Sequence, residues 1–367
     1  MDSKELAALR AQVDGIDDKI IELLRERMRV AGQIGDRKIA MLKEAQDFDF
    51  VDPAREAQVI KRLQDQAGTE LPAEFVSRLY REIMAEALNR QHPVKASYLG
   101  PAGTFSHEAA LQHFGVATEL VPQDSIRACA DAVEHDKARY AVVPYENSTE
   151  GGVGETLALL LETRLRACGE TQLRVRQHLL GRAGQDLGAL RLVYSHPQSF
   201  AQCRSWFEGN LPGAARIECA SNSAAALAAS KEEGAAAIGP RGAALQHGLE
   251  VLVEDIEDNP DNVTRFLILG KDEARPSGND KTSIVFSVHD RPGALHDMLR
   301  YFSDSGLNLT RLESRPEPGS RLGNYMFFVD VIGHGAEEPL KGILAKVAKE
   351  AASFTNIGSY PRVEIGG

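Results

Sequence analysis

The sequence predicts a multidomain protein of three modules: an all-α module, a larger α/β module and a small α+β module. Residues 4 to about 91 carry helical periodicity and few glycines. Beyond residue 96, short apolar runs such as "YAVVP" and "AAAIG" alternate with helix-like segments, which is typical of an α/β sheet. A polar linker with Pro and Gly, residues 271–281, precedes the order strand, helix, strand, strand, helix, strand of a ferredoxin-like unit. We therefore expect domains at 1–92, 96–270 and 282–360.

Composition limits the possible functions before any motif is considered. With 367 residues, of which 43% are hydrophobic and 26% charged, the chain can form several buried cores. A net charge of -11 disfavours binding to nucleic acid or to an anionic membrane, because both require a basic surface. The sequence has no apolar N-terminal signal segment and no stretch that approaches the roughly 20 apolar residues of a spanning helix. The four cysteines are far apart, so we expect reduced thiols and a cytoplasmic protein.

The first predicted helix carries an apolar stripe that cations interrupt. The stripe, which we expect to face a core, consists of Val13, Ile16, Ile20, Leu23, Leu24 and Ile34. Arg27 takes a stripe position, and Lys38 follows eleven residues later, close to three whole turns, so both should project from one face. An internal salt bridge to Asp52 or Glu56 is one explanation. The other is a small anionic ligand with two carboxylates, held in a pocket that further arginines complete.

Residues 6–91 resemble the all-helical chorismate mutase, whose three-helix subunits interlock as a dimer and share each active site. By position, the active-site pattern of that family falls on Arg10 (reaching in from the partner chain), Arg27, Lys38, Asp52, Arg55, Glu56 and Gln91. The resemblance implies a pericyclic rearrangement, which needs a dianion held compact and donors on the ether oxygen. Lys38 and Gln91 would be those donors. Ala87 departs from relatives that carry a hydroxyl at that position.

In the α/β region each apolar run ends in polar residues, as in "GPAGTFSHEA", "YENSTEGG", "YSHPQSFAQC" and "SNSAAA". Helix capping is one explanation, and for Ser223 it is the better one. The other is a ligand site, because strand ends and helix N-termini meet at the crevice of an open α/β sheet. "GPAGTFS" lacks the G-x-G-x-x-G spacing, so a dinucleotide site is not indicated.

The stretch "NVTRFLIL" sets Thr264 and Arg265 directly before a buried strand. A solvated loop closing onto the core would explain them without a function. If this strand runs antiparallel to its neighbours, Thr264 and Arg265 both face the crevice.

These motifs resemble prephenate dehydratase over residues 97–270. The resemblance implies two α/β lobes around a cleft, like periplasmic binding proteins. It makes Thr264 the central catalytic residue, a donor to the departing oxygen, with Glu146 as an alternative acid or a structural carboxylate. His196 either binds substrate or only orients its turn. The implied catalytic residues are Thr264, Asn147, Gln202 and Glu146, and the implied substrate-binding residues are Thr104, Ser106, Ser195, His196 and Arg265.

The C-terminal region resembles an ACT domain over residues 282–360, with "GALH" and "ESRP" in the positions that bind phenylalanine. The implied effector contacts are the amides of Gly293, Ala294 and Leu295 for the carboxylate, and Glu313 and Ser314 for the ammonium group. Without that resemblance "ESRP" is a charged loop.

Taken together, the sequence predicts a bifunctional enzyme that converts chorismate to prephenate and prephenate to phenylpyruvate, and that senses L-phenylalanine. We expect a homodimer through the helical and ACT modules, with no metal or organic cofactor. One rival is a regulatory protein that binds these metabolites without turnover. The other is a dehydratase with an inactive helical appendage.

Overall fold

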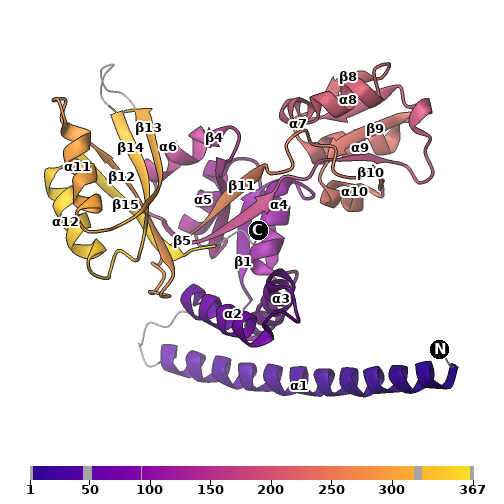
Figure 1. The fold of residues 1–367 in the computed structure, drawn as a ribbon, viewed down its shortest axis with the longest axis horizontal. Helices are drawn as coiled ribbons and strands as arrows, with labels where there is room; N and C mark the ends of the chain where they lie inside the picture. Colours follow the sequence, from indigo (N-terminus) through magenta and orange to yellow (C-terminus); the bar gives the residue numbers. More distant parts are fainter. Residues whose placement is uncertain (1–2, 44–51, 92, 318–324, 364–367) are drawn as a thin grey trace.

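The computed structural model describes residues 3–43, 52–91, 93–317 and 325–363. Figure 1 shows a helical region, two α/β lobes and a C-terminal unit of sheet and helices. The three expected fold classes are therefore confirmed. Within the described ranges, none of the helices combines the length and apolar character needed to cross a bilayer.

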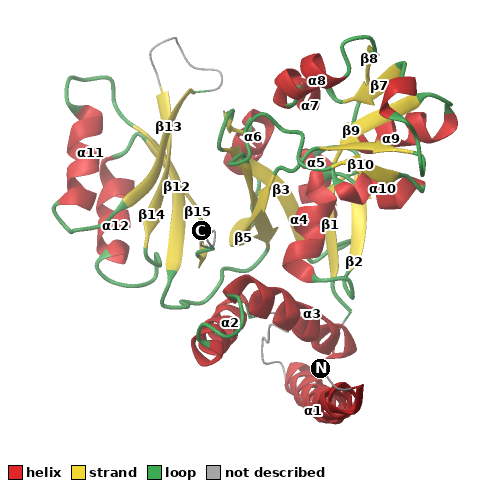
Figure 2. Cartoon of the chain, turned by 45° about the vertical axis from the view of Figure 1, so that its right-hand side comes forward, coloured by secondary structure: helices red, strands yellow, loops and turns green. Residues whose placement is uncertain are grey.

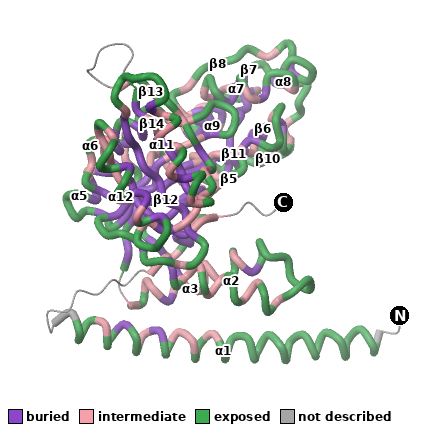
Figure 3. Tube along the Cα trace, turned by 60° about the vertical axis from the view of Figure 1, so that its left-hand side comes forward, coloured by how far each residue is buried: buried purple, intermediate pink, exposed green. Residues whose placement is uncertain are grey.

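The helical region contains α1 (Ser3–Lys43), α2 (Pro53–Ala67) and α3 (Ala73–Gln91). Asp52 caps α2, because its carboxylate accepts from Arg55 N (2.9 Å). In α1, the buried Ala31 and Gly35 lie in the half nearer its C-terminus, whereas its N-terminal half is exposed (Figure 3). The apolar stripe is not a core face within this chain. Its members are half to two-thirds exposed, except for the half-buried Leu24.

The first α/β lobe is a mixed sheet in the order β2-β1-β3-β11-β5, with β4 paired to β3. Strand β11, near the end of the module, inserts between β3 and β5 and is antiparallel to both. The elements are β1 (Lys95–Leu99), α4 (Phe105–Phe114), β2 (Glu119–Gln123), α5 (Ile126–Glu134), β3 (Tyr140–Asn147), β4 (Gly151–Gly152), α6 (Gly154–Glu162), β5 (Arg166–Arg174) and β11 (Val263–Gly270).

The second lobe has its own sheet, in the order β10-β6-β9-β7-β8, and its own apolar core around Val193, Phe207 and Ile238. The two lobes are joined by residues 175–177 and 254–262. The elements are β6 (His178–Gly181), a 3-10 turn (Leu187–Ala189), β7 (Leu192–Ser195), α7 (Pro197–Gln202), α8 (Arg204–Asn210), β8 (Ala215–Glu218), α9 (Asn222–Lys231), β9 (Ala235–Gly239), α10 (Arg241–His247) and β10 (Glu250–Val253).

The C-terminal unit has the expected ferredoxin-like order of elements around an antiparallel sheet, β13-β14-β12-β15. Its two helices cover one face of that sheet, and the other face turns to the first lobe (Figure 2). The elements are β12 (Asp280–Ser287), α11 (Ala294–Ser303), β13 (Leu309–Pro316), β14 (Tyr325–Ile332), α12 (Leu340–Glu350) and β15 (Ser353–Pro361).

The C-terminal sheet shares a buried core with the first lobe. Phe328 and Tyr360 pack in one apolar cluster with Leu267 of β11. Gly358 of β15 lies against the backbone of Ala167 in β5, where an added Cβ would collide. The predicted linker is therefore shorter than expected, since β12 begins at Asp280 and its first residues are buried.

Candidate active sites

The antiparallel insertion of β11 places Thr264 beside Asn147, at the end of β3. Asn147 Nδ2 donates a hydrogen bond to Thr264 Oγ1 (3.0 Å). Asn147 Oδ1 accepts from the backbone N–H groups of Thr149 (2.9 Å) and Glu150 (3.1 Å). Because two backbone donors fix that oxygen, the amide cannot turn over. Thr264 Oγ1 thus accepts a bond from Asn147, and that bond does not use the hydroxyl proton of Thr264.

Arg265 points away from Thr264, because consecutive residues of a strand project to opposite faces. Its side chain is buried between the first lobe and the C-terminal sheet. There it pairs with Glu170 (Nε to Oε2, 2.6 Å) and Asp330, and Nη2 donates to the Tyr360 hydroxyl (2.7 Å). The prediction that Arg265 faces the same crevice as Thr264 is wrong, because it treated both neighbours in the strand alike.

Glu146 also turns toward the C-terminal sheet. The register of β3 and β11 shifts between Arg265 and Phe266, which leaves Tyr145 as an extra residue in a β-bulge. The Glu146 carboxylate then meets two guanidinium groups, Arg265 Nη1 (3.4 Å) and Arg311 Nε (3.4 Å). Its described ion pairs thus lie at the module interface.

In the second lobe, Gln202 lies at the end of α7, where its Oε1 accepts from Gln177 Nε2 (2.9 Å). The other two predicted residues make structural bonds. Ser195 is fully buried and donates to Ile238 O (3.0 Å). His196 caps α7, with Nδ1 accepting from Gln198 N (3.3 Å), as expected if it only orients the turn.

Hydrogen bonds bridge the lobes near these groups. Gln198 Nε2 donates to Glu150 Oε2 (2.7 Å), which brings α7 to the turn that follows Asn147. Ser223 Oγ donates to Ala102 O (2.6 Å). The prediction that Ser223 caps a helix is wrong, because α9 begins earlier and Ser221 caps it.

The "GPAGTFS" turn faces the second lobe through its backbone. Thr104 caps α4 by accepting from His107 N (3.4 Å), and its hydroxyl donates to Pro101 O (3.0 Å). Ser106 is buried in the first turn of that helix. The structure therefore gives Thr104 a structural role and brings the start of α4 to the boundary between the lobes.

In the helical region, Arg27 and Gln91 lie on the face where α1 meets α3. Arg27 Nη1 donates to Ile83 O (3.3 Å), so its described partner is a backbone carbonyl and neither Asp52 nor Glu56. Gly35 lies so close to Gln91 that an added Cβ would be 2.7 Å from Gln91 Cγ. Lys38 follows Gly35 by less than one turn and is half-buried.

Two further predicted residues have distinctive surroundings. Burial raises the pKa of Glu56 to about 7; the nearby Asp52 adds to this rise and Arg81 opposes it. A carboxyl with that pKa is partly protonated at neutral pH and can donate a hydrogen bond. Arg10 is exposed, and at 1.5 Å per residue it lies about 25 Å along α1 from Arg27. Arg10 cannot reach the Arg27 site of its own chain.

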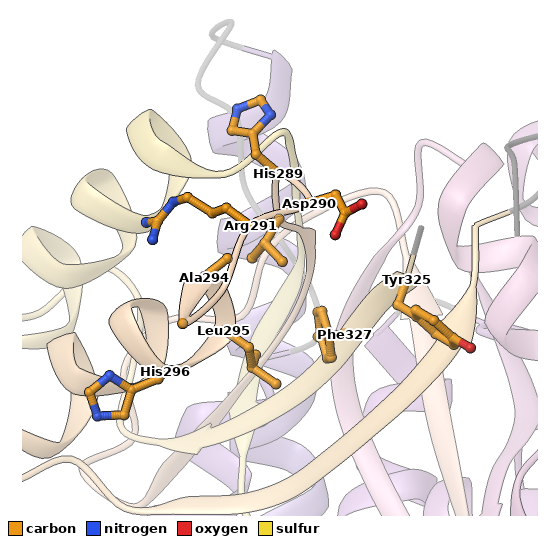
Figure 4. A pocket seen from close by; sticks show the side chains of 10 residues that line it. His289, Asp290, Arg291, Ala294, Leu295, His296, Tyr325 and Phe327 are labelled. Carbon is orange, nitrogen blue, oxygen red and sulfur yellow. The ribbon is translucent and has the colours of Figure 1, made fainter. Parts of the chain in front are cut away.

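The C-terminal unit contains a pocket of about 230 Å³ at the start of α11 (Figure 4). Gly293, Ala294 and Leu295 all line it, together with Phe327. Ser314 pairs in register with Phe327 and therefore lies on the same face of the sheet.

Glu313 lies on the opposite face of the sheet from Ser314. It pairs with Phe328, and its carboxylate meets Arg311 and Arg315 (Nε to Oε1, 2.6 Å) beside Gly152 of the first lobe. The prediction that Glu313 and Ser314 flank one ligand is wrong, because the strand alternation separates them.

Asn262 was not singled out in the sequence, although it opens the "NVTRF" motif. Its Oδ1 accepts from Asn147 Nδ2 (2.8 Å), and its side chain is buried. Gln177 and Arg311 were also missed, because nothing in their local sequence distinguishes them from surface residues.

The three regions match three known families. Residues 9–92 match chorismate mutase type II, residues 96–274 match prephenate dehydratase, and residues 282–349 match the ACT domain. These matches and the structure define a multifunctional enzyme with an ACT module. Its parts are the helical module, the two lobes that hold the Thr264–Asn147 pair, and the C-terminal module that contains the pocket.

Full-length relatives narrow this class. The chain is 42% identical to the bifunctional chorismate mutase/prephenate dehydratase of Pseudomonas aeruginosa, over 98% of this chain and 99% of that protein. It belongs to the bifunctional chorismate mutase/prephenate dehydratase family.

Two solved structures resemble the part of the chain that follows the helical module. One is the prephenate dehydratase of Arthrobacter aurescens in complex with L-Phe, with a TM-score of 0.67, 35% identity, and coverage of 73% of this chain and 90% of that chain. The other, described as GqqA, a novel type of quorum quenching acylase, has a TM-score of 0.67, 30% identity, and coverage of 73% and 98%.

Proposed function

We infer that this chain is a bifunctional enzyme of phenylalanine biosynthesis. It rearranges chorismate to prephenate, converts prephenate to phenylpyruvate, and is feedback-inhibited by L-phenylalanine. The observation that carries the inference is the Asn147–Thr264 pair, held by the antiparallel insertion of β11 in a chain whose full length matches bifunctional enzymes. We also propose a cytoplasmic location, which the free cysteines favour.

For the second reaction, we assign Thr264 as the hydrogen-bond donor to the departing oxygen. Prephenate loses its ring carboxylate as CO₂; the electrons of that C–C bond enter the ring, and the C4–O bond breaks with its electron pair on oxygen. That oxygen needs a proton as it leaves. Thr264 is suited to this role because Asn147 occupies its acceptor side and leaves its O–H to point at the ligand.

Glu146 is the less suitable acid. Its carboxylate is held by Arg265 and Arg311, so its ion pairs connect it to the C-terminal sheet. Gln202, whose Oε1 already accepts from Gln177, keeps its amide N–H groups for the substrate. We therefore assign Thr264, Asn147 and Gln202 to the reaction, and Glu146 and Arg265 to the interface between modules.

For the first reaction, we assign the α1–α3 face to the binding of chorismate. The rearrangement breaks one C–O bond and forms one C–C bond within a single dianion, so it needs neither nucleophile nor base. Arg27 and Lys38 supply positive charge, and Gln91 supplies an amide beside Gly35. Asp52 and Arg55 shape the start of α2, and Glu56 can donate as a partly protonated carboxyl.

We propose that two chains share each mutase site. The apolar side chains of α1 are exposed along its length; Val13 is 55% and Ile16 54% exposed, and surfaces of this kind mark protein interfaces. A partner helix that covers this stripe would bring its Arg10 to the site formed by Arg27 and Lys38. We propose that the ACT modules also pair in this homodimer.

Mixing two inactive variants tests the shared site. Arg10→Ala and Lys38→Ala chains each lack mutase activity alone, but a mixed dimer contains one intact site. After joint unfolding and refolding, the mixture should recover about a quarter of wild-type mutase activity, because half of the dimers are mixed and each has one working site. Arg27→Ala mixed with Lys38→Ala is the control, since both residues come from one chain and no mixed site is intact. Recovery in both mixtures, or in neither, would contradict the sharing of sites.

We assign phenylalanine to the pocket at the start of α11. Backbone amides at a helix N-terminus bind carboxylates, and Gly293 and Leu295 line this pocket. Ala294 also lines it, but its N–H donates to Arg291 O (3.2 Å). Phe327 and Leu295 supply apolar surface, and Ser314 lies on the same face.

Strand β13 connects this pocket with the dehydratase lobes. One face of β13 carries Ser314, while the other carries Arg311 and Glu313 against Glu146 and Gly152. Phenylalanine inhibits by binding an inactive arrangement more tightly than the active one, and β13 is placed to transmit that preference.

Ser314→Ala should raise the phenylalanine concentration for half-inhibition at least about tenfold, the effect of losing one hydrogen bond of about 1.4 kcal/mol. Prephenate turnover without phenylalanine should stay near the wild-type rate. Ser205→Ala, an exposed serine of the second lobe, is the control. Unchanged inhibition in Ser314→Ala would place the effector elsewhere.

The whole proposal is tested by assaying one preparation with chorismate and with prephenate, each with and without phenylalanine. Prephenate and then phenylpyruvate should form, and phenylalanine should slow the second step. Binding without turnover would support the rival of a regulatory protein. Turnover of prephenate alone would support a dehydratase with an inactive helical module.

A further inference from the structure

The two segments that join the lobes each end in a buried amide side chain. Residues 175–177 end at Gln177, which is 0% exposed, and residues 254–262 end at Asn262, which is 3% exposed. Most buried polar groups in folded proteins have hydrogen-bond partners. Their partners are the side chains that the proposed function assigns to catalysis.

The two joining segments are fixed to each other. Val175 N donates to Asn262 O (2.8 Å), and Ile256 N donates to Gln177 O (2.8 Å). The side chain of Glu257 adds two bonds, to Gln177 N (2.9 Å) and to Arg176 Nη1 (2.7 Å). Gln177 and Asn262 therefore belong to one bonded unit between the lobes.

Asn262 holds the turn that contains Asn147. Its Oδ1 accepts from Asn147 Nδ2 (2.8 Å), Ser148 Oγ (3.3 Å) and Thr149 Oγ1 (3.3 Å). The second proton of Asn147 Nδ2 goes to Thr264 Oγ1 (3.0 Å). Both protons of that amide are thus committed. The bonds from Thr149 N and Glu150 N hold Asn147 Oδ1, and the bond to Asn262 holds one Nδ2 proton, so the other proton is directed at Thr264.

Gln177 holds Gln202 in the other lobe by donating a hydrogen bond, whereas Asn262 holds Asn147 by accepting one. Gln177 Nε2 donates to Gln202 Oε1 (2.9 Å) and to Ser199 Oγ (2.9 Å). Its own Oε1 is buried and has no partner among the described residues. The described contacts of the Gln177 side chain therefore use its donor end, which is directed at Gln202.

We propose that Asn262 and Gln177 are positioning residues of the dehydratase, one for the amide of Asn147 and one for the amide of Gln202. This inference rests on the proposed function. In a hinge motion, the backbone torsions change in the segments that connect the two lobes. A rotation of the lobes would therefore move the side-chain amides of Asn262 and Gln177 together. The site is then assembled only at one angle between the lobes.

Asn262 acts as an acceptor and Gln177 as a donor, so replacing each amide by the corresponding carboxylic acid should have opposite effects on kcat. Asn262→Asp keeps the acceptor and should retain at least about a third of wild-type kcat, whereas Asn262→Leu should lower kcat at least about tenfold with KM within about threefold. Gln177→Glu replaces a donor by an acceptor facing Gln202 Oε1, and should lower kcat like Gln177→Met. Asn308→Leu, an exposed asparagine outside the joining segments, is the control and should behave as wild type.

A double-mutant cycle shows whether Asn262 acts through Asn147. Asn147→Leu should lower kcat strongly, and adding Asn262→Leu should lower it no further than about threefold. Losses that multiply, or a normal kcat in Asn262→Leu, would overturn the inference. Thermal unfolding and phenylalanine binding are measured on each variant. If Asn262→Leu fails to fold, the contrast of Asn262→Asp with Gln177→Glu decides.

Failure of the proposed function gives a different result. If wild type does not turn over prephenate, or if Asn147→Leu is as fast as wild type, the assignment of the site fails and this inference falls with it. If wild type turns over prephenate and Asn147→Leu is slow, but Asn262→Leu is as fast as wild type, only the positioning role is overturned.

Discussion

Thr264→Val is expected to lower the kcat for prephenate at least about a hundredfold, the range for losing one preorganised donor at a reacting oxygen. Valine has nearly the shape of threonine and fits a strand, so β11 should keep its place between β3 and β5. The lost group is the hydroxyl, whose acceptor side Asn147 occupies. Thr264→Ser should keep much of the rate.

The measurement is steady-state formation of phenylpyruvate, with mutase activity followed in the same preparation. Thr163→Val serves as control, since its hydroxyl donates to Glu134 (2.6 Å) on the surface of the same lobe. Near-normal turnover in Thr264→Val would mean that Thr264 only closes a loop onto the core.

Arg27→Ala and Lys38→Ala should each lower mutase kcat/KM at least about a hundredfold, because each removes a charge-assisted contact to a dianion. Prephenate turnover should be unaffected, since the α1–α3 face is separate from Thr264. Arg29→Ala is the matched control on the same helix, with a side chain that is 71% exposed. Parallel loss of both activities in a folded variant would contradict the separation of the two sites.

The sequence predicted the classes of elements well, because periodicity and glycine spacing depend on local structure. The resemblance to prephenate dehydratase placed Asn147 beside Thr264, although they are far apart in the chain, and the antiparallel pairing of β11 with β3 accounts for their contact. The sequence could not predict which face of β11 each side chain occupies. Arg265 follows Thr264 directly, and only the pairing of whole modules shows that it turns to Asp330 and Tyr360.

The other errors have the same physical origin. The bulge at Tyr145 moves Glu146 toward the C-terminal sheet, and a single extra residue in one strand has no sequence signature. Glu313 and Ser314 were grouped because they are neighbours in "ESRP", yet alternation puts them on opposite faces. The stripe of α1 was correctly found to be apolar, but periodicity cannot say whether the surface that covers it belongs to the same chain.

The shared core beneath the C-terminal sheet has a consequence for how such enzymes can evolve. A chain that ended near residue 275 would expose the faces of Leu267 and Ala167 and would leave Arg265 without Asp330, and a buried guanidinium that loses its acid is costly. The ACT module is thus not an independent domain attached only by a linker. A recombination event that exchanged the ACT module would succeed only if the matching surface of the dehydratase were inherited with it. We therefore expect the dehydratase and ACT segments to be inherited together in gene fusions. The helical segment can be gained or lost independently.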